Sequence, residues 1–217
     1  MAKKKDKGPR PVEIVVAAVL SGILGVVGAV AFLVLQPPEE VTEMPAEEDR
    51  EFGLVYYVTG KGGNASHGTW LAKKEAVKTK RSGNLALVEE ELNQWAAQKL
   101  KETAEIEKPL LHIEAGMPNF RIAEDSLFVG VPLTWSMFGF GRTFDSHTSG
   151  RFKNSGAGYG FEHDRVYVGS CPVPGLLANR LVNDVVASYA VPEELNEGWN
   201  ALESVALEES SLKLVIP

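Results

Sequence analysis

Two short clusters in the second half of the chain carry residue types that can do acid–base or nucleophilic chemistry. Asp145-Ser146-His147 contains the three residue types of a serine hydrolase, and Glu162-His163-Asp164 places a second histidine between two carboxylates. Adjacent residues of a strand point to opposite faces of a sheet, so neither triplet can form a proton relay by itself. A hydrolase would have to combine Asp145 and His147 with His163, and no Gly-x-Ser-x-Gly elbow presents a nucleophile.

The other polar motifs lack the spacing of a cofactor site. Thr59-Gly60-Lys61-Gly62-Gly63-Asn64 resembles a phosphate-binding loop, but Ala65 follows where such a loop continues to its lysine and hydroxyl. The four histidines share no metal-ligand spacing, and Cys171, the only cysteine, has no partner for a disulfide within the chain. We therefore predict no cofactor and no metal. The formal net charge of −7 also argues against a nucleic-acid partner.

An uncharged segment near the N-terminus predicts a membrane-spanning helix. Ile14 to Leu35 is a run of 22 residues without a charged side chain. As a helix it would be about 33 Å long, enough to cross a hydrocarbon layer of about 30 Å. Residues 1–13 are rich in lysine and residues 37–51 are rich in glutamate. The positive-inside rule then places the N-terminus in the cytoplasm and the rest outside.

Two further interpretations concern this helix. A cleaved signal peptide is the alternative, since Ala29-Val30-Ala31 has the small residues of a cleavage site. The apolar run continues past that site to Leu35, which favours a retained helix that contacts the lipid bilayer through residues 14–35. Ser21, Gly25 and Ala29 recur every four residues, and such a stripe of small residues could pack two helices into a homodimer.

The chain divides into four parts by composition: a basic cytoplasmic tail (1–13), a transmembrane helix (14–36), an acidic proline-containing tether (37–51) and an extracytoplasmic domain (52–217). The tether should be extended and solvated. We predict an α+β fold for the domain, with antiparallel strands packed against two or three amphipathic helices. The predicted helices are Trp70–Lys80, Val88–Glu102 and Leu176–Tyr189.

The clearest strand pattern lies at the centre of this domain. Over Ser126 to Phe138 every second residue is apolar, which predicts a strand with one buried face. Pro132 cannot donate a ladder hydrogen bond, so it predicts an edge strand or a bulge. Further strands are predicted over Leu110–Ile113, Phe120–Ile122, Thr143–Phe152, Arg165–Gly169 and Leu212–Ile216.

Three short motifs carry a family resemblance. They are Leu-Val-Glu-Glu-Glu-Leu-Asn-Gln-Trp at 87–95, Val-Gly-Ser-Cys-Pro-Val-Pro-Gly at 168–175, and the closing strand Leu212–Ile216. Together they resemble small single-pass bacterial envelope proteins of unknown function, although Val88 stands where their pattern has Ser or Thr. The exported part of those proteins is similar to the tubular lipid-binding (TULIP) and AsmA-like folds. The resemblance implies a protein of the bacterial inner membrane in which a helix lies in a curved antiparallel sheet.

The same resemblance implies an apolar groove between sheet and helix. The residues expected to line the groove are Leu92, Trp95, Val129, Val131, Leu133, Trp135, Leu181 and Val185. The implied function is a non-enzymatic membrane-anchored module that binds lipid or another apolar ligand, or that scaffolds envelope proteins. Three alternatives stay open: a closed core without a groove, a hydrolase built on Asp145, His147 and His163, and an assembly partner without a pocket.

Overall fold

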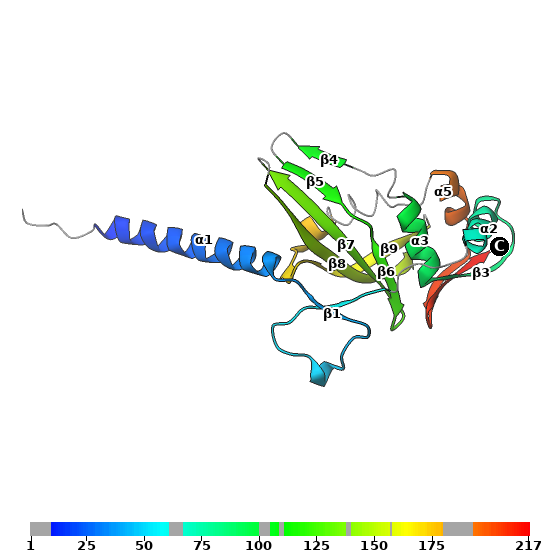
Figure 1. Cartoon of the computed structure of the whole chain (residues 1–217), viewed down its shortest axis with the longest axis horizontal. Coiled ribbons are helices and arrows are strands. Elements are labelled where there is room, and N and C mark those ends of the chain that lie inside the picture. The colour runs from blue at the N-terminus through cyan, green and yellow to red at the C-terminus, as the bar shows by residue number, and fades with distance from the viewer. Residues whose placement is uncertain are drawn as a thin grey trace, which may run out of the picture.

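An apolar helix extends away from the sheets and helices of an α+β domain in the computed structural model of the chain (Figure 1). The structure describes residues 10–60, 67–99, 105–108, 111–137, 140–156, 158–179 and 193–217. Helix α1 (Pro11–Leu35) has 25 residues, and none of them is buried against the protein. By length and composition α1 can span a membrane.

Local sequence explains both ends of α1. Pro11 occupies the first turn, where its missing N–H costs no hydrogen bond, and the Glu13 carboxylate accepts the N–H of Arg10. The helix ends at Leu35, just before Pro37 and Pro38. The stripe of small residues lies on this helix, and its members are exposed in the monomer: Ser21, Gly25 and Ala29.

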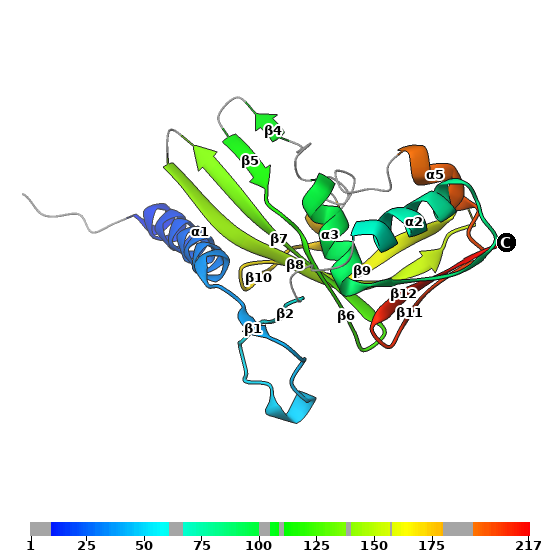
Figure 2. The same ribbon diagram turned by 45° about the vertical axis from the view of Figure 1, so that its right-hand side comes forward.

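Two antiparallel sheets, three helices and a further helical segment at residues 175–179 build the described part of the domain (Figures 1 and 2). The strands of the large sheet, in the order β10-β9-β8-β7-β5-β4 with β6 also paired to β7, are β4 (Glu105–Lys108), β5 (Leu111–Ala115), β6 (Asn119–Ala123), β7 (Ser126–Met137), β8 (Phe140–Asn154), β9 (Tyr159–Val168) and β10 (Cys171–Pro172). The strands of the small sheet, in the order β11-β12-β3, are β3 (Gly83–Val88), β11 (Ser204–Glu208) and β12 (Ser211–Ile216). The helices that lie against these sheets are α2 (His67–Lys78), α3 (Glu89–Lys99) and α5 (Glu193–Asn200). The mixed α+β class is thus confirmed.

The predicted helices match the structure where it describes them. The helix predicted over Trp70–Lys80 is α2, and the one predicted over Val88–Glu102 is α3. Of the third, over Leu176–Tyr189, the structure describes only residues 176–179, and these are helical. Five elements of this part of the chain have no counterpart among the predicted elements: β3, β4, β10, β11 and α5. They are short, and β3 packs as an outer strand beside β12.

Strand β7 confirms the predicted alternation, but the prediction for Pro132 is wrong. Leu127, Val129, Val131 and Leu133 are all buried on one face. Pro132 lies in a strand that has neighbours on both sides, because β8 pairs with one edge of β7 and both β5 and β6 pair with the other. Pairing with β6 stops at Gly130 and pairing with β5 starts at Leu133. The missing N–H of Pro132 falls in this gap, so it breaks no ladder hydrogen bond.

The structure differs from the predicted free tether in residues 39–41. They form β1 (Glu39–Val41), which pairs in parallel with β2 (Tyr56–Val58), and residues 47–49 form a 3-10 helix (Glu47–Asp49). Strand β2 of this pair lies on the face of the large sheet opposite to the buried side chains of Leu127, Val129 and Val131, which we call the back face. There Tyr57 packs so closely over Gly130 that a Cβ on Gly130 would lie 2.0 Å from the Tyr57 hydroxyl.

The C-terminal end of α1 is fixed to the domain by hydrogen bonds. The N–H of Ser170 donates to the carbonyl of Leu33 at 2.9 Å, and the Ser170 hydroxyl donates to the carbonyl of Pro37 at 3.3 Å. Gly169 has a φ of +58°, in the left-handed region, and its Cβ position lies 2.3 Å from the carbonyl oxygen of Val34. The helix therefore enters the domain through a contact that requires glycine at position 169.

We expect Gly169→Ala to loosen this junction while leaving the domain folded. Both the left-handed backbone, at about 1–2 kcal/mol for a residue with a Cβ, and the steric overlap oppose the substitution. Amide hydrogen exchange of Ser170 should become about tenfold faster. Gly175→Ala is the matched control, because a Cβ there would meet no atom within 4 Å. Unchanged exchange at Ser170 in Gly169→Ala would show that the junction does not depend on this contact.

Candidate functional site

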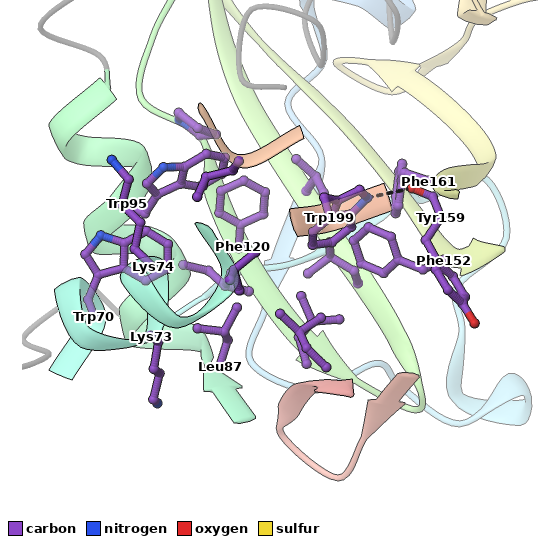
Figure 3. Close-up of a pocket in the computed structure, with 18 of the residues that line it drawn as sticks. Trp70, Lys73, Lys74, Leu87, Trp95, Phe120, Phe152, Tyr159, Phe161 and Trp199 are labelled. Carbon is purple, nitrogen blue, oxygen red and sulfur yellow. Dashed lines mark hydrogen bonds between the residues drawn. The ribbon is translucent and has the colours of Figure 1, made fainter. Parts of the chain in front are cut away.

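An apolar cavity of about 290 Å³ lies between the two sheets and beneath α2, α3 and α5 (Figure 3). Its size is at the lower end of the range of ligand sites, about 300–1,000 Å³. Apart from two lysines, its lining is apolar or aromatic: Trp70, Lys73, Lys74, Val77, Leu87, Leu92, Trp95, Pro118, Phe120, Leu127, Val129, Val131, Phe152, Tyr159, Phe161, Leu195, Trp199, Leu212 and Leu214. We refer to it below as the apolar cavity.

One wall of the apolar cavity is aromatic and has its polar atoms satisfied (Figure 3). The indole N–H of Trp199 donates to the carbonyl of Tyr159 at 2.8 Å, and the Tyr159 hydroxyl donates to the carbonyl of Glu203 at 2.9 Å. The Phe152 ring packs edge-on against Phe161 and Trp199, with centroids 5.8 and 5.7 Å away. This wall therefore offers a ligand apolar surface and no unpaired hydrogen-bonding group among these side chains.

The opposite wall, made by α2 and α3, contains an ion pair. The Lys73 ammonium lies 2.7 and 2.6 Å from the two carboxylate oxygens of Glu91 and 2.6 Å from the carbonyl of Ala86. The Glu91 side chain is 3% exposed, and it also accepts the N–H of Val88, at 3.0 Å. Glu91 thus supplies the carboxylate half of a capping box, accepting the N–H of the N-cap residue Val88, which itself has no hydroxyl. The rings of Trp70 and Trp95 lie beside this pair, with centroids 6.1 Å apart.

The structure brings together four of the residues predicted to line the groove. Leu92, Trp95, Val129 and Val131 all line the apolar cavity. Leu133 is buried in the same hydrophobic cluster but does not line the cavity. Trp135 lies on β7, but the structure does not describe its side chain. Leu181 and Val185 lie outside the described residues.

Sequence reasoning missed most of the aromatic lining. The missed rings are Trp70, Phe120, Phe152, Tyr159, Phe161 and Trp199. The spacing of residues in the sequence could have indicated two pairs of lining residues. Tyr159 and Phe161 are two residues apart, as on one face of a strand, and Leu195 and Trp199 are four apart, as on one face of a helix.

The two histidines of the predicted hydrolase lie on opposite faces of the large sheet. Residues paired across neighbouring strands point to the same face. His163 lies opposite Gly150, which lies opposite Leu127, a residue of the apolar cavity. His147 lies opposite Gly130, on the back face. The structure thus does not bring His147 and His163 together, and the described residues contain no group of three potential metal ligands.

His147 is instead enclosed by aromatic rings on the back face. Its ring is stacked on Tyr167 and tilted against Tyr57, with both centroid distances 5.2 Å. Neither ring nitrogen has a hydrogen-bond partner in the structure, and burial lowers the pKa of His147 to about 4. Burial also raises the pKa of Tyr57, and the negative charges of Glu40 and Asp145 raise it further. His147 is therefore neutral at neutral pH and packs as an aromatic ring.

Comparison with known proteins adds no assignment to this geometry. No family model matches the chain, and no curated protein matches it.

Proposed function

We propose that the protein is a membrane-anchored extracytoplasmic module that binds a lipid or another apolar ligand in the apolar cavity. The observation that carries the proposal is the cavity itself, with its almost entirely apolar lining. Such a lining offers a ligand the burial of apolar surface, which contributes about 25 cal/mol for each Å² removed from water. The proposal names no catalytic residue, because the candidate acid–base residues lie elsewhere.

The energetics of packing favour a ligand over an empty core. Protein interiors pack as densely as organic crystals, with few voids larger than a water molecule. The apolar cavity is open to solvent, so without a ligand its apolar lining is covered by water. An apolar ligand that displaced this water would gain about 25 cal/mol for each Å² of apolar surface buried.

The anchor and its junction support the proposed location. Helix α1 is long and apolar enough to span a bilayer, and a lysine-rich segment precedes it, which favours a cytoplasmic N-terminus. We propose the bacterial inner membrane as the site of this anchor. Because Ser170 is hydrogen-bonded to Leu33, the domain would be held at the bilayer surface, where apolar ligands are concentrated. The small-residue stripe of α1 supports a homodimer as a further hypothesis.

Filling the apolar cavity tests the proposal. In Val129→Phe a larger side chain would occupy the cavity from the centre of β7. We expect the affinity for 1-aminoanthracene, a neutral apolar fluorophore, to fall at least about tenfold, because the probe loses the volume in which it is buried. Binding would be measured by probe fluorescence on the full-length protein in a nonionic amphipathic polymer.

Leu177→Phe is the matched control, because this exposed side chain does not line the cavity. It should bind the probe like the natural protein. Thermal unfolding of Val129→Phe would show whether the variant is folded. Failure of the natural protein to bind the probe, or undiminished binding by a folded Val129→Phe, would favour a closed core and overturn the proposal.

A further inference from the structure

The turns of the large sheet differ in polarity between its two ends. Glu124 and Asp125 join β6 to β7, and Ser155 follows the last residue of β8. Such polar residues are typical of turns that lie in water. At the other end of the sheet β7 ends at Met137 and β8 begins at Phe140, so the described residues nearest to this turn are apolar. This end of the β7–β8 hairpin is therefore better suited to an apolar environment than to water.

Strand register places the apolar residues of this hairpin end on one face. Met137 pairs with Phe140, and Trp135 pairs with Arg142. Residues two apart on a strand share a face, as do residues paired across two strands. We call this shared face the hairpin face, and its residues are Trp135, Met137, Phe140 and Arg142. Arg142 is the only charged residue among residues 134–144. An aromatic and apolar surface with one arginine is typical of proteins at the interface of a membrane.

The junction with α1 relates the large sheet to the bilayer that α1 would span. Ser170 donates to the carbonyl of Leu33, so Ser170 lies at the level of the last turn of α1. The N–H of the preceding residue, Gly169, donates to the carbonyl of Asp145 at 2.7 Å. Asp145 of β8 therefore lies close to the level at which α1 would leave the bilayer.

Strand β8 extends beyond this level. Strand β9 runs towards the junction and ends at Val168, opposite Ser146, whereas the antiparallel β8 begins at Phe140. At about 3.4 Å per residue, Phe140 lies roughly 17 Å along the strand from Asp145. Figures 1 and 2 both show this end of the β7–β8 hairpin on the side of the domain from which α1 extends. The hairpin face is therefore on the membrane side of the domain.

We infer that the hairpin face rests in the interface of the bilayer that α1 spans, as a second membrane contact of the domain. The inference rests on the membrane anchoring that belongs to the proposed function, and it adds a lipid-binding surface and an orientation. The three apolar residues would lie among the upper acyl chains. The exposed side chain of Arg142 would reach the lipid phosphates. A single helix leaves the domain free to tilt, whereas two contacts fix how it faces the membrane.

A fluorescent label at the hairpin end tests this contact. Met137→Cys, in full-length protein that also carries Cys171→Ser, would be labelled with nitrobenzoxadiazole and placed in nanodiscs of phosphatidylcholine and phosphatidylglycerol. A surface in the interface lies about 5–10 Å deep, so lipids with a nitroxide near the head group should quench the label at least about threefold. Ser155→Cys, an exposed position beyond the other end of β8, is the matched control and should not be quenched. Equal quenching at the two positions would overturn the inference.

A charge on the hairpin face tests whether its apolar residues make the contact. Phe140→Asp should return the quenching at position 137 to the level of the control, because a carboxylate is unfavourable among acyl chains. Thr143→Asp adds the same charge at an exposed position on the opposite face of the hairpin and should leave the quenching unchanged. Thermal unfolding would show that both variants are folded. Undiminished quenching in a folded Phe140→Asp would also overturn the inference.

Other outcomes separate the hairpin contact from the function on which it rests. A label at position 137 whose emission shifts to the blue without quenching would mean that protein, such as a second copy of the chain, covers the hairpin face, and the inference would be wrong. If 1-aminoanthracene binds and the label is not quenched, only the hairpin contact fails. If the label is quenched and the probe does not bind, the hairpin contact stands and the apolar cavity loses its proposed role. Loss of the protein from the nanodiscs would overturn the anchor on which both depend.

Discussion

Replacing Lys73 by Met should lower the free energy of unfolding by about 3 kcal/mol, because it leaves the Glu91 carboxylate buried without its counter-charge. The Glu91 side chain is 3% exposed, and Lys73 provides the nearest cation, at 2.6 Å. In the variant the carboxylate would keep the N–H of Val88 as a donor. Chemical denaturation of the full-length protein, followed by tryptophan fluorescence, would measure the loss.

Two further variants identify the cause of this loss. Lys73→Met combined with Glu91→Leu removes both charges, and we expect the double variant to regain most of the lost stability, since apolar residues often replace a buried ion pair at little cost. Lys78→Met, on the exposed side of α2, should change stability by less than about 0.5 kcal/mol. A loss in Lys73→Met no larger than that in Lys78→Met would mean that the pair contributes little to the fold.

The second large effect is a pH dependence of stability that originates from His147. The pKa of His147 is about 4 in the folded protein, against 6.5 for an ordinary histidine, so the unfolded chain binds the additional proton between these values. Stability from this group is fully present above about pH 6.5, falls as the pH decreases towards 4, and changes no further below that. Over the whole window the loss is roughly 3 kcal/mol, at about 1.4 kcal/mol for each pH unit.

A comparison with His147→Phe isolates this effect from the carboxylates that titrate in the same range. Phenylalanine keeps a ring between Tyr57 and Tyr167 but cannot be protonated. Denaturant unfolding at a series of pH values between 4 and 7 should show a steeper loss of stability for the natural protein than for the variant. Parallel curves for the two proteins would show that His147 does not titrate in a buried site.

Local periodic patterns of apolar residues in the sequence were sufficient to predict much of the fold. The uncharged run of α1, the 3.6-residue period of α3 and the two-residue period of β7 each depend on residues that are close together along the chain. They predicted α+β architecture and the apolar faces of α3 and β7, whereas the groove, with four residues of the apolar cavity, was implied by the family resemblance. They did not predict β1 or the position of Pro132 in the large sheet, because strand pairing joins segments that are distant in sequence.

By itself, the sequence determined a helix that can cross a membrane, a basic flank before it, and a domain whose strands and helices each have one apolar side. These follow from residue type and local spacing. Only the tertiary structure decided that the apolar sides leave a cavity between them, since its lining runs from Trp70 to Leu214 through both sheets and three helices. The tertiary structure also placed His147 and His163 on opposite faces of the large sheet. The physical reason is the same in each case: a cavity and a buried site depend on which distant segments pack together, and no local period of the chain encodes that choice.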